Sequence, residues 1–163
     1  MDFIQQFEIS TEICDEILSN LTITVKEKAA IEVDLPEIHE PLSEFMVKYL
    51  TTIEEFNYFG DISKLNFEFH NTMIRYIPPW AYQMYEHGEG GNFIFFIFLV
   101  DNDSVFEVFN PFIRGDVRFR PHKGLVIVIP AVWMFMFRHS DTGFKSSIFI
   151  SGAISINNLN NKQ

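Results

Sequence analysis

The segment YEHGEGG at 85–91 places an imidazole and a carboxylate two positions apart, at His87 and Glu89. Imidazole nitrogens and carboxylate oxygens both bind transition metals, and three such ligands on one side of a metal leave positions open for other molecules. The neighbouring glycines also fit an ordinary loop, with Glu89 in solvent. His87 and Glu89 are therefore candidate metal ligands that require a third partner.

A second candidate region is PAVWMFMFRH at 130–139, a strand-like stretch that follows a proline. Side chains alternate along a strand, so both faces of this stretch are apolar. One face carries Trp133, Phe135 and Phe137, and the other carries Met134 and Met136. Arg138 at its end is a candidate for an anion-binding or structural pairing role, although ion pairing at the surface is the default explanation.

In order along the chain, these segments resemble the Fe(II)/2-oxoglutarate-dependent oxygenases, in particular the small prolyl-4-hydroxylase-like proteins common in phage genomes. The resemblance extends from about Tyr76 to Ile156. An H-x-D/E pair precedes a hydrophobic strand in that family, as His87-Gly88-Glu89 precedes FIFFIFLVDND here. A PxKGxLxxFPxxWxHxHRG segment follows in the family, and the matching residues are Pro121, Lys123, Gly124, Leu125, Pro130, Ala131, Trp133 and Arg138.

The resemblance implies a facial triad of two imidazoles and one carboxylate that holds Fe(II). The family's second histidine falls on Phe135, with Phe137 at the companion position, and a phenyl ring offers a metal no lone pair. His139 has the parity of Phe135 but lies ~13 Å further along a strand. A shifted register would use Tyr85 and His87, and it supplies no carboxylate.

The resemblance also implies a cation that holds the far carboxylate of 2-oxoglutarate. Lys145 takes that place if the count starts at Phe135, whereas Ser147 takes it if the count starts at Gly152. Arg138 is the other candidate for an anion-binding residue.

We therefore expect a catalytically inactive oxygenase-like domain that needs no cofactor and acts as a binding or structural module, in a phage-encoded or virion setting. The alternative is an active Fe(II)/2-oxoglutarate hydroxylase with an atypical metal site. A third reading is a sugar- or peptide-binding jelly roll with exposed aromatic residues such as Trp80 and Tyr82. Other catalytic motifs, including G-x-S-x-G, H-E-x-x-H and C-x-x-C, are absent from the sequence.

Two helices are expected to precede the sheet. The first runs from the capping residue Ser10 to about Asn20, and the second begins at Pro41, where proline loses no helical hydrogen bond. Apolar residues of the second helix recur with helical spacing, which indicates a face that covers a sheet. They are Leu42, Phe45, Met46, Tyr49, Leu50 and Ile53.

After about residue 64 the sequence consists of short β-rich segments separated by turn residues, which predicts a sandwich or barrel. The segments are NFEFH, TMIRYI, FIFFIFLV, VFEVF, DVRFR, LVIVI, VWMFMF and SIFISGAISI. The predicted class is α+β: a double-stranded β-helix, or jelly-roll, core with two N-terminal covering helices. We expect a single domain over 1–163, with a helical part at 1–60, the jelly-roll core at 64–156 and a polar tail at 157–163.

The chain has 163 residues, 19 of them Phe, and its 22 acidic and 12 basic residues give a net charge of −10. That charge repels phosphate backbones, so we expect a protein partner or self-assembly and no nucleic acid. The longest apolar run has eight residues, far below the ~20 that cross a bilayer, and the N-terminus lacks the basic start of a signal peptide. We therefore expect a soluble protein with no membrane partner, cytoplasmic or virion-associated, with Cys14 as a buried structural thiol.

Overall fold

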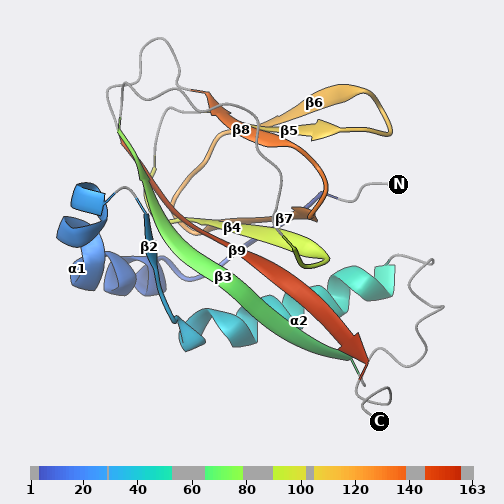
Figure 1. Ribbon diagram of the computed structural model, residues 1–163, viewed down its shortest axis with the longest axis horizontal. Coiled ribbons are helices and arrows are strands. Elements are labelled where there is room, and N and C mark those ends of the chain that lie inside the picture. The colour runs from blue at the N-terminus through green and yellow to red at the C-terminus, as the bar shows by residue number, and fades with distance from the viewer. Residues whose placement is uncertain are drawn as a thin grey trace.

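The computed structural model describes residues 4–28, 30–52, 65–78, 90–101, 105–138 and 146–158. Two antiparallel sheets face each other, and two helices lie on the side of the larger sheet that faces away from the smaller one (Figure 1). The larger sheet has the order β1 (Gln5–Glu8), β7 (Leu125–Pro130), β4 (Phe93–Phe98), β9 (Ser147–Asn158), β3 (Leu65–Ile77), β2 (Ala30–Glu32). The smaller sheet has the order β6 (Gly115–Phe119), β5 (Val105–Asn110), β8 (Phe135–Arg138). The expected α+β class with a jelly-roll core is confirmed.

The first helix, α1 (Thr11–Lys28), begins where the sequence predicts, and the backbone N–H of Glu12 donates to Ser10 Oγ at 3.2 Å. Its expected end near Asn20 is wrong. The following residues, LTITVKEK, contain neither glycine nor proline. β-branched residues lower helix propensity only slightly, so nothing in this stretch stops the helix.

The second helix, α2 (Pro36–Thr52), begins five residues before the expected start at Pro41. Pro36 also fits a first helical position because its missing N–H has no partner there. Pro41 lies inside the helix, where it removes one backbone hydrogen bond. The predicted apolar stripe is confirmed for the described residues, since Leu42, Met46, Tyr49 and Leu50 are buried and Phe45 packs against the same core.

The strand assignment also needs correction at both ends of the sheet. β3 is one strand rather than two, because Asn71 takes a left-handed φ of 52° and the register shifts between His70 and Met73 without ending the pairing with β9. β1 and β2 were not predicted. At the other end, Asn157 and Asn158 pair with β3 instead of opening a polar tail.

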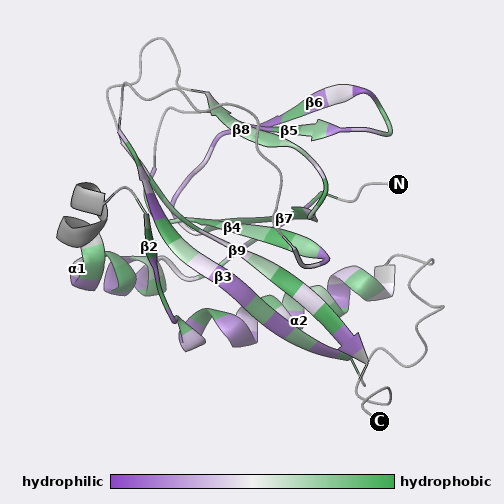
Figure 2. Ribbon diagram, in the orientation of Figure 1, coloured by the Kyte–Doolittle hydropathy of each residue, from purple (hydrophilic) through white to green (hydrophobic). Residues whose placement is uncertain are grey.

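The apolar run FIFFIF is explained by a strand that is buried on both faces, and Figure 2 shows the hydrophobic colouring along β4. Phe93, Phe95 and Ile97 face the helices, in a core that includes most of α2's apolar stripe. Ile94, Phe96 and Phe98 face the smaller sheet in a second core. The large sheet is therefore the middle of three layers, and the second core lies where the candidate site was expected.

No helix within the described residues is long and apolar enough to cross a membrane.

Candidate functional site

The strand β8 places position 135 at the start of an inward-facing row. Phe135 pairs with Val108 and Phe137 with Phe106 across the ladder to β5. Before the strand, the chain turns so that the Trp133 N–H donates to the Pro130 carbonyl at 3.1 Å. The sequence predicted that Trp133, Phe135 and Phe137 share a face, and all three belong to the core between the sheets.

Phenyl rings from four strands fill the space beside β8. We call this group the phenylalanine cluster: Phe96, Phe98, Phe106, Phe135, Phe137 and Phe149, none of which is more than 4% exposed. The Phe135 ring lies edge-on to Phe96 with centroids 4.7 Å apart, and Phe137 stacks on Phe149 at 4.5 Å. Position 135 therefore contributes an apolar ring to a packed core.

The two methionines on the other face of this stretch, Met134 just before β8 and Met136 within it, differ in burial. Met134 is exposed, whereas Met136 is buried beside Glu107, its partner across the ladder. The Glu107 carboxylate is 1% exposed and accepts from the Arg118 guanidinium at 2.9 Å. This ion pair was not predicted from the sequence. VFEVF and DVRFR flank one turn, and the register of the resulting hairpin brings Glu107 opposite Arg118.

Five of the candidate residues from the sequence lie outside the residues that the structure describes: His87, Glu89, Lys145, Tyr85 and His139. Arg138 ends β8, where it pairs with Val105, and its side chain is not described. Within the described ranges, no group of three or more His, Cys, Asp or Glu side chains is arranged to hold a metal ion.

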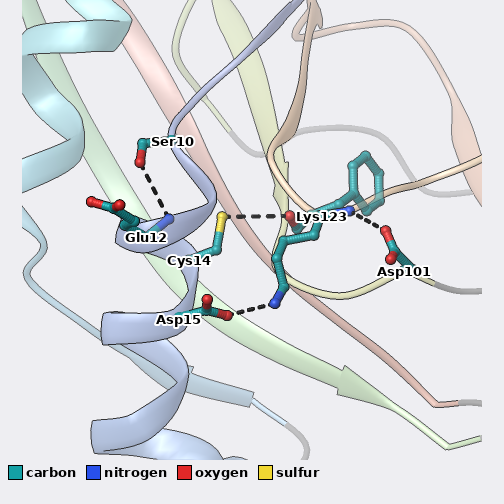
Figure 3. A network of polar contacts seen from close by, with 7 residues as sticks. Ser10, Glu12, Cys14, Asp15, Asp101 and Lys123 are labelled. Atoms are coloured by element: carbon teal, nitrogen blue, oxygen red, sulfur yellow. Dashed lines mark hydrogen bonds and ion pairs between the residues drawn. The ribbon is translucent and has the colours of Figure 1, made fainter.

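Lys123, one of the residues that match the family segment, holds the N-terminal helix against the sheets. Its backbone N–H donates to Asp101 Oδ1 at 2.8 Å, and its ammonium donates to Asp15 Oδ1 at 2.5 Å (Figure 3). The hydrogen bond that Lys123 donates to Asp15 raises the pKa of Lys123. Next to this pair, the imidazole of His122 contacts the carboxylate of Glu8 at the end of β1.

Cys14, next to Asp15 on α1, belongs to the same network, with Sγ 4.0 Å from the Phe98 carbonyl oxygen (Figure 3). The side chain is fully buried, which confirms the predicted structural thiol. Burial raises the pKa of the Cys14 thiol above its ordinary value of 9.0, and the nearby Gly124 backbone and Lys123 ammonium only partly oppose that shift.

The raised pKa predicts how stability changes in mild base. Above about pH 9 the unfolded chain loses the thiol proton while the folded chain keeps it, so this group lowers the free energy of unfolding as pH rises. We expect urea unfolding at pH 8 to 10 to show a steeper decline for the unmodified protein than for Cys14→Ala. Equal slopes would contradict a shifted thiol. A thiol reagent should modify Cys14 only after unfolding.

No protein-family model matches the chain, and no curated protein matches it in sequence. Solved structures do match in fold. A viral collagen prolyl hydroxylase from Paramecium bursaria Chlorella virus-1 matches 94% of this chain and 90% of its own with a TM-score of 0.62 at 13% identity. A Pseudomonas putida prolyl-4-hydroxylase matches over 94% of this chain and 92% of the hydroxylase chain, with a TM-score of 0.67 and 9% sequence identity. The non-heme α-ketoglutarate-dependent carbocyclase SnoK matches over 95% of this chain and 79% of the SnoK chain, with a TM-score of 0.64 and 7% sequence identity.

The chain has the fold of the Fe(II)/2-oxoglutarate oxygenases. The match extends over nearly the whole chain, well beyond the segment from Tyr76 to Ile156 that carried the resemblance in sequence. Because the identities are 13% or lower, the likeness lies in the fold rather than in particular side chains. Of the residues that match the family segment, Lys123 lies in the turn before β7, Pro130 ends β7, and Trp133 lies in the connection to β8.

Proposed function

We propose that this chain is a member of the oxygenase superfamily that does not catalyse metal-dependent oxidation and that acts as a binding or structural module. The observation that supports this most is Phe135, at the position where the resemblance expects a metal-binding histidine. Its ring packs against Phe96 in the phenylalanine cluster and is nearly inaccessible to solvent. A phenyl ring in that place offers no lone pair to a metal.

Position 135 lacks a metal ligand and carries an apolar side chain in its place. Without a ligand at position 135, His87 and Glu89 would leave the facial triad one ligand short, so they would hold Fe(II) weakly. A buried phenyl side chain instead contributes roughly 1.5–3 kcal/mol of hydrophobic stabilisation. The domain then gains core packing where an oxygenase has a polar site, and it needs no cofactor.

A phage-encoded or virion component is the setting that we propose for this module. The phage-type resemblance in sequence supports this setting, and one solved structure with the same fold is a protein of a Chlorella virus. The net charge of −10 favours a protein partner or self-assembly over nucleic acid. Jelly rolls serve as capsid and lectin domains as well as enzymes, which is compatible with a structural role.

An anaerobic titration with Mn(II) or Fe(II) in the presence of 2-oxoglutarate tests this proposal. We expect no binding heat and no rise in the thermal unfolding midpoint, because only a ligand that binds the folded state stabilises it. In Phe135→His, a metal-dependent rise in the midpoint is expected if His87 and Glu89 occupy the remaining ligand places.

Phe137→His is the matched control, since it introduces the same side chain on the same strand, ~7 Å away. It should not bind the metal. Adding His87→Ala to Phe135→His should remove the gained binding and so identify the second ligand. Clear stabilisation of the unmodified protein by metal plus 2-oxoglutarate would instead indicate the hydroxylase with an atypical site.

A further inference from the structure

Exposed apolar side chains gather on two turns of the protein. We call this surface the apolar corner. Phe112 and Ile113, in the turn from β5 to β6, are 71% and 64% exposed. Val132 and Met134, in the connection from β7 to β8, are 83% and 42% exposed. Among the described residues, the one other large hydrophobic side chain with comparable exposure is Val47, on α2.

The two turns of the apolar corner lie against each other and are held in place. The Phe112 ring lies edge-on to the buried Trp133 ring, with centroids 6.1 Å apart. The Phe109 N–H donates to the Met134 carbonyl oxygen at 2.9 Å. The Asn110 side chain accepts from the Phe112 N–H at 3.0 Å, which fixes the turn. The apolar corner is therefore one surface whose two turns are held by these contacts. Exposed apolar patches of this kind mark interaction sites.

The charges around the apolar corner are balanced, in contrast to the rest of the chain. Arg114 and Asp116 are both exposed and lie two positions apart at the tip of the hairpin. Over the β5–β6 hairpin, residues 105–119, two basic residues (Arg114, Arg118) and two acidic ones (Glu107, Asp116) give 2 − 2 = 0, whereas the whole chain carries −10. Two copies of the protein therefore repel each other least when they approach through this region.

We propose that the apolar corner is a two-fold contact between two copies of this chain. In a two-fold contact each surface meets itself, so Phe112 and Ile113 of one copy can cover Val132 and Met134 of the other. The same symmetry brings Arg114 of one copy toward Asp116 of the other. A rim with one cation and one anion complements itself, whereas an anionic lipid surface or an acidic peptide would call for a basic rim.

The size of the apolar corner sets the expected strength of the contact. Four exposed apolar side chains form only a small patch, and contacts that bury less than about 1,200 Å² in total are typical of weak, transient complexes. The dimer should therefore form with a dissociation constant on the order of 10–100 µM. Salt should strengthen it, because added ions screen the repulsion between two acidic proteins and leave the apolar contact intact.

Sedimentation equilibrium from about 5 to about 500 µM protein tests the contact. We expect the average mass to rise with protein concentration from 19.1 kDa toward twice that value. The rise should occur at a lower protein concentration in about 0.5 M NaCl than in about 0.05 M NaCl. Ile113→Lys and Val132→Lys should each weaken association by roughly tenfold or more, because a charge would enter the apolar centre of the contact.

Val47→Lys is the control, since it places the same charge on another exposed apolar residue, on α2 and away from the corner, and it should leave association unchanged. The three variants should keep the unfolding midpoint of the unmodified protein. A protein that stays monomeric throughout, or a dimer that Ile113→Lys and Val132→Lys do not weaken, would overturn the proposal. So would a monomer that binds anionic vesicles through Ile113, which would assign the corner to a membrane. This test measures association rather than metal binding, so it can fail while the proposed function stands.

Discussion

Phe96→Ala is expected to lower the free energy of unfolding by about 3–5 kcal/mol, the range for truncating a fully buried phenylalanine. Phe96 lies at the centre of the phenylalanine cluster, with ring centroids 4.7 Å from both Phe106 and Phe135 and 6.3 Å from Phe149. Alanine would leave a cavity between two sheets that are fixed by their hydrogen-bond ladders, so neighbouring rings could close it only in part. Urea unfolding with an unchanged m-value would measure the loss.

Phe112→Ala is the matched control for this substitution. It removes the same ring from a side chain that is 71% exposed, and it should cost less than about 1 kcal/mol. Similar losses at both positions would mean that the cluster contributes no more than a surface contact. A large difference would support the idea that aromatic packing occupies the centre of this fold, which Phe135→Ala should then reproduce from the β8 side.

Much of the fold could be predicted because hydrophobic periodicity is a local signal. The continuous apolar runs FIFFIF and LVIVI, bounded by turn residues, predicted strands, and the structure buries both faces of each. β1 and β2 were not predicted because strands of four and three residues are too short to show a hydrophobic periodicity. They form by pairing with β7 and β3, respectively. The start of α2 was missed because two prolines, Pro36 and Pro41, offered the same signal.

The candidate site was predictable on its apolar side only. The burial of Phe135 and Phe137 follows from parity along β8, whereas the polar candidates His87, Glu89 and Lys145 lie outside the described residues. Glu107 shows the opposite case. Its pairing with Arg118 depends on the register of the β5–β6 hairpin. A register shift of one residue would place the two side chains on opposite faces of the sheet.

Gly124→Ala is expected to destabilise the protein by about 2–4 kcal/mol, from left-handed strain together with overpacking. Gly124 has a φ of +91°, and a Cβ there would lie 2.8 Å from the Ile9 carbonyl oxygen. The Ile9 N–H donates to the Gly124 carbonyl at 2.9 Å, so two backbone segments are pressed together and no flexible side chain can move aside. Urea unfolding would give the loss, and hydrogen exchange at the Ile9 amide should become faster.

Gly90→Ala separates the two causes. Gly90 has a similar φ of +87°, but nothing lies within 4 Å of its ideal Cβ position. This variant should show only the cost of a left-handed residue, about 1–2 kcal/mol, and normal protection at Ile9. If both variants lost the same free energy of unfolding, the close approach of Ile9 to Gly124 would not contribute to the loss. A larger loss at Gly124 would mean that this glycine, which matches the oxygenase segment, is required for attaching the N-terminal segment to the sheet. Its match would then be evidence for the fold and would say nothing about oxidation chemistry.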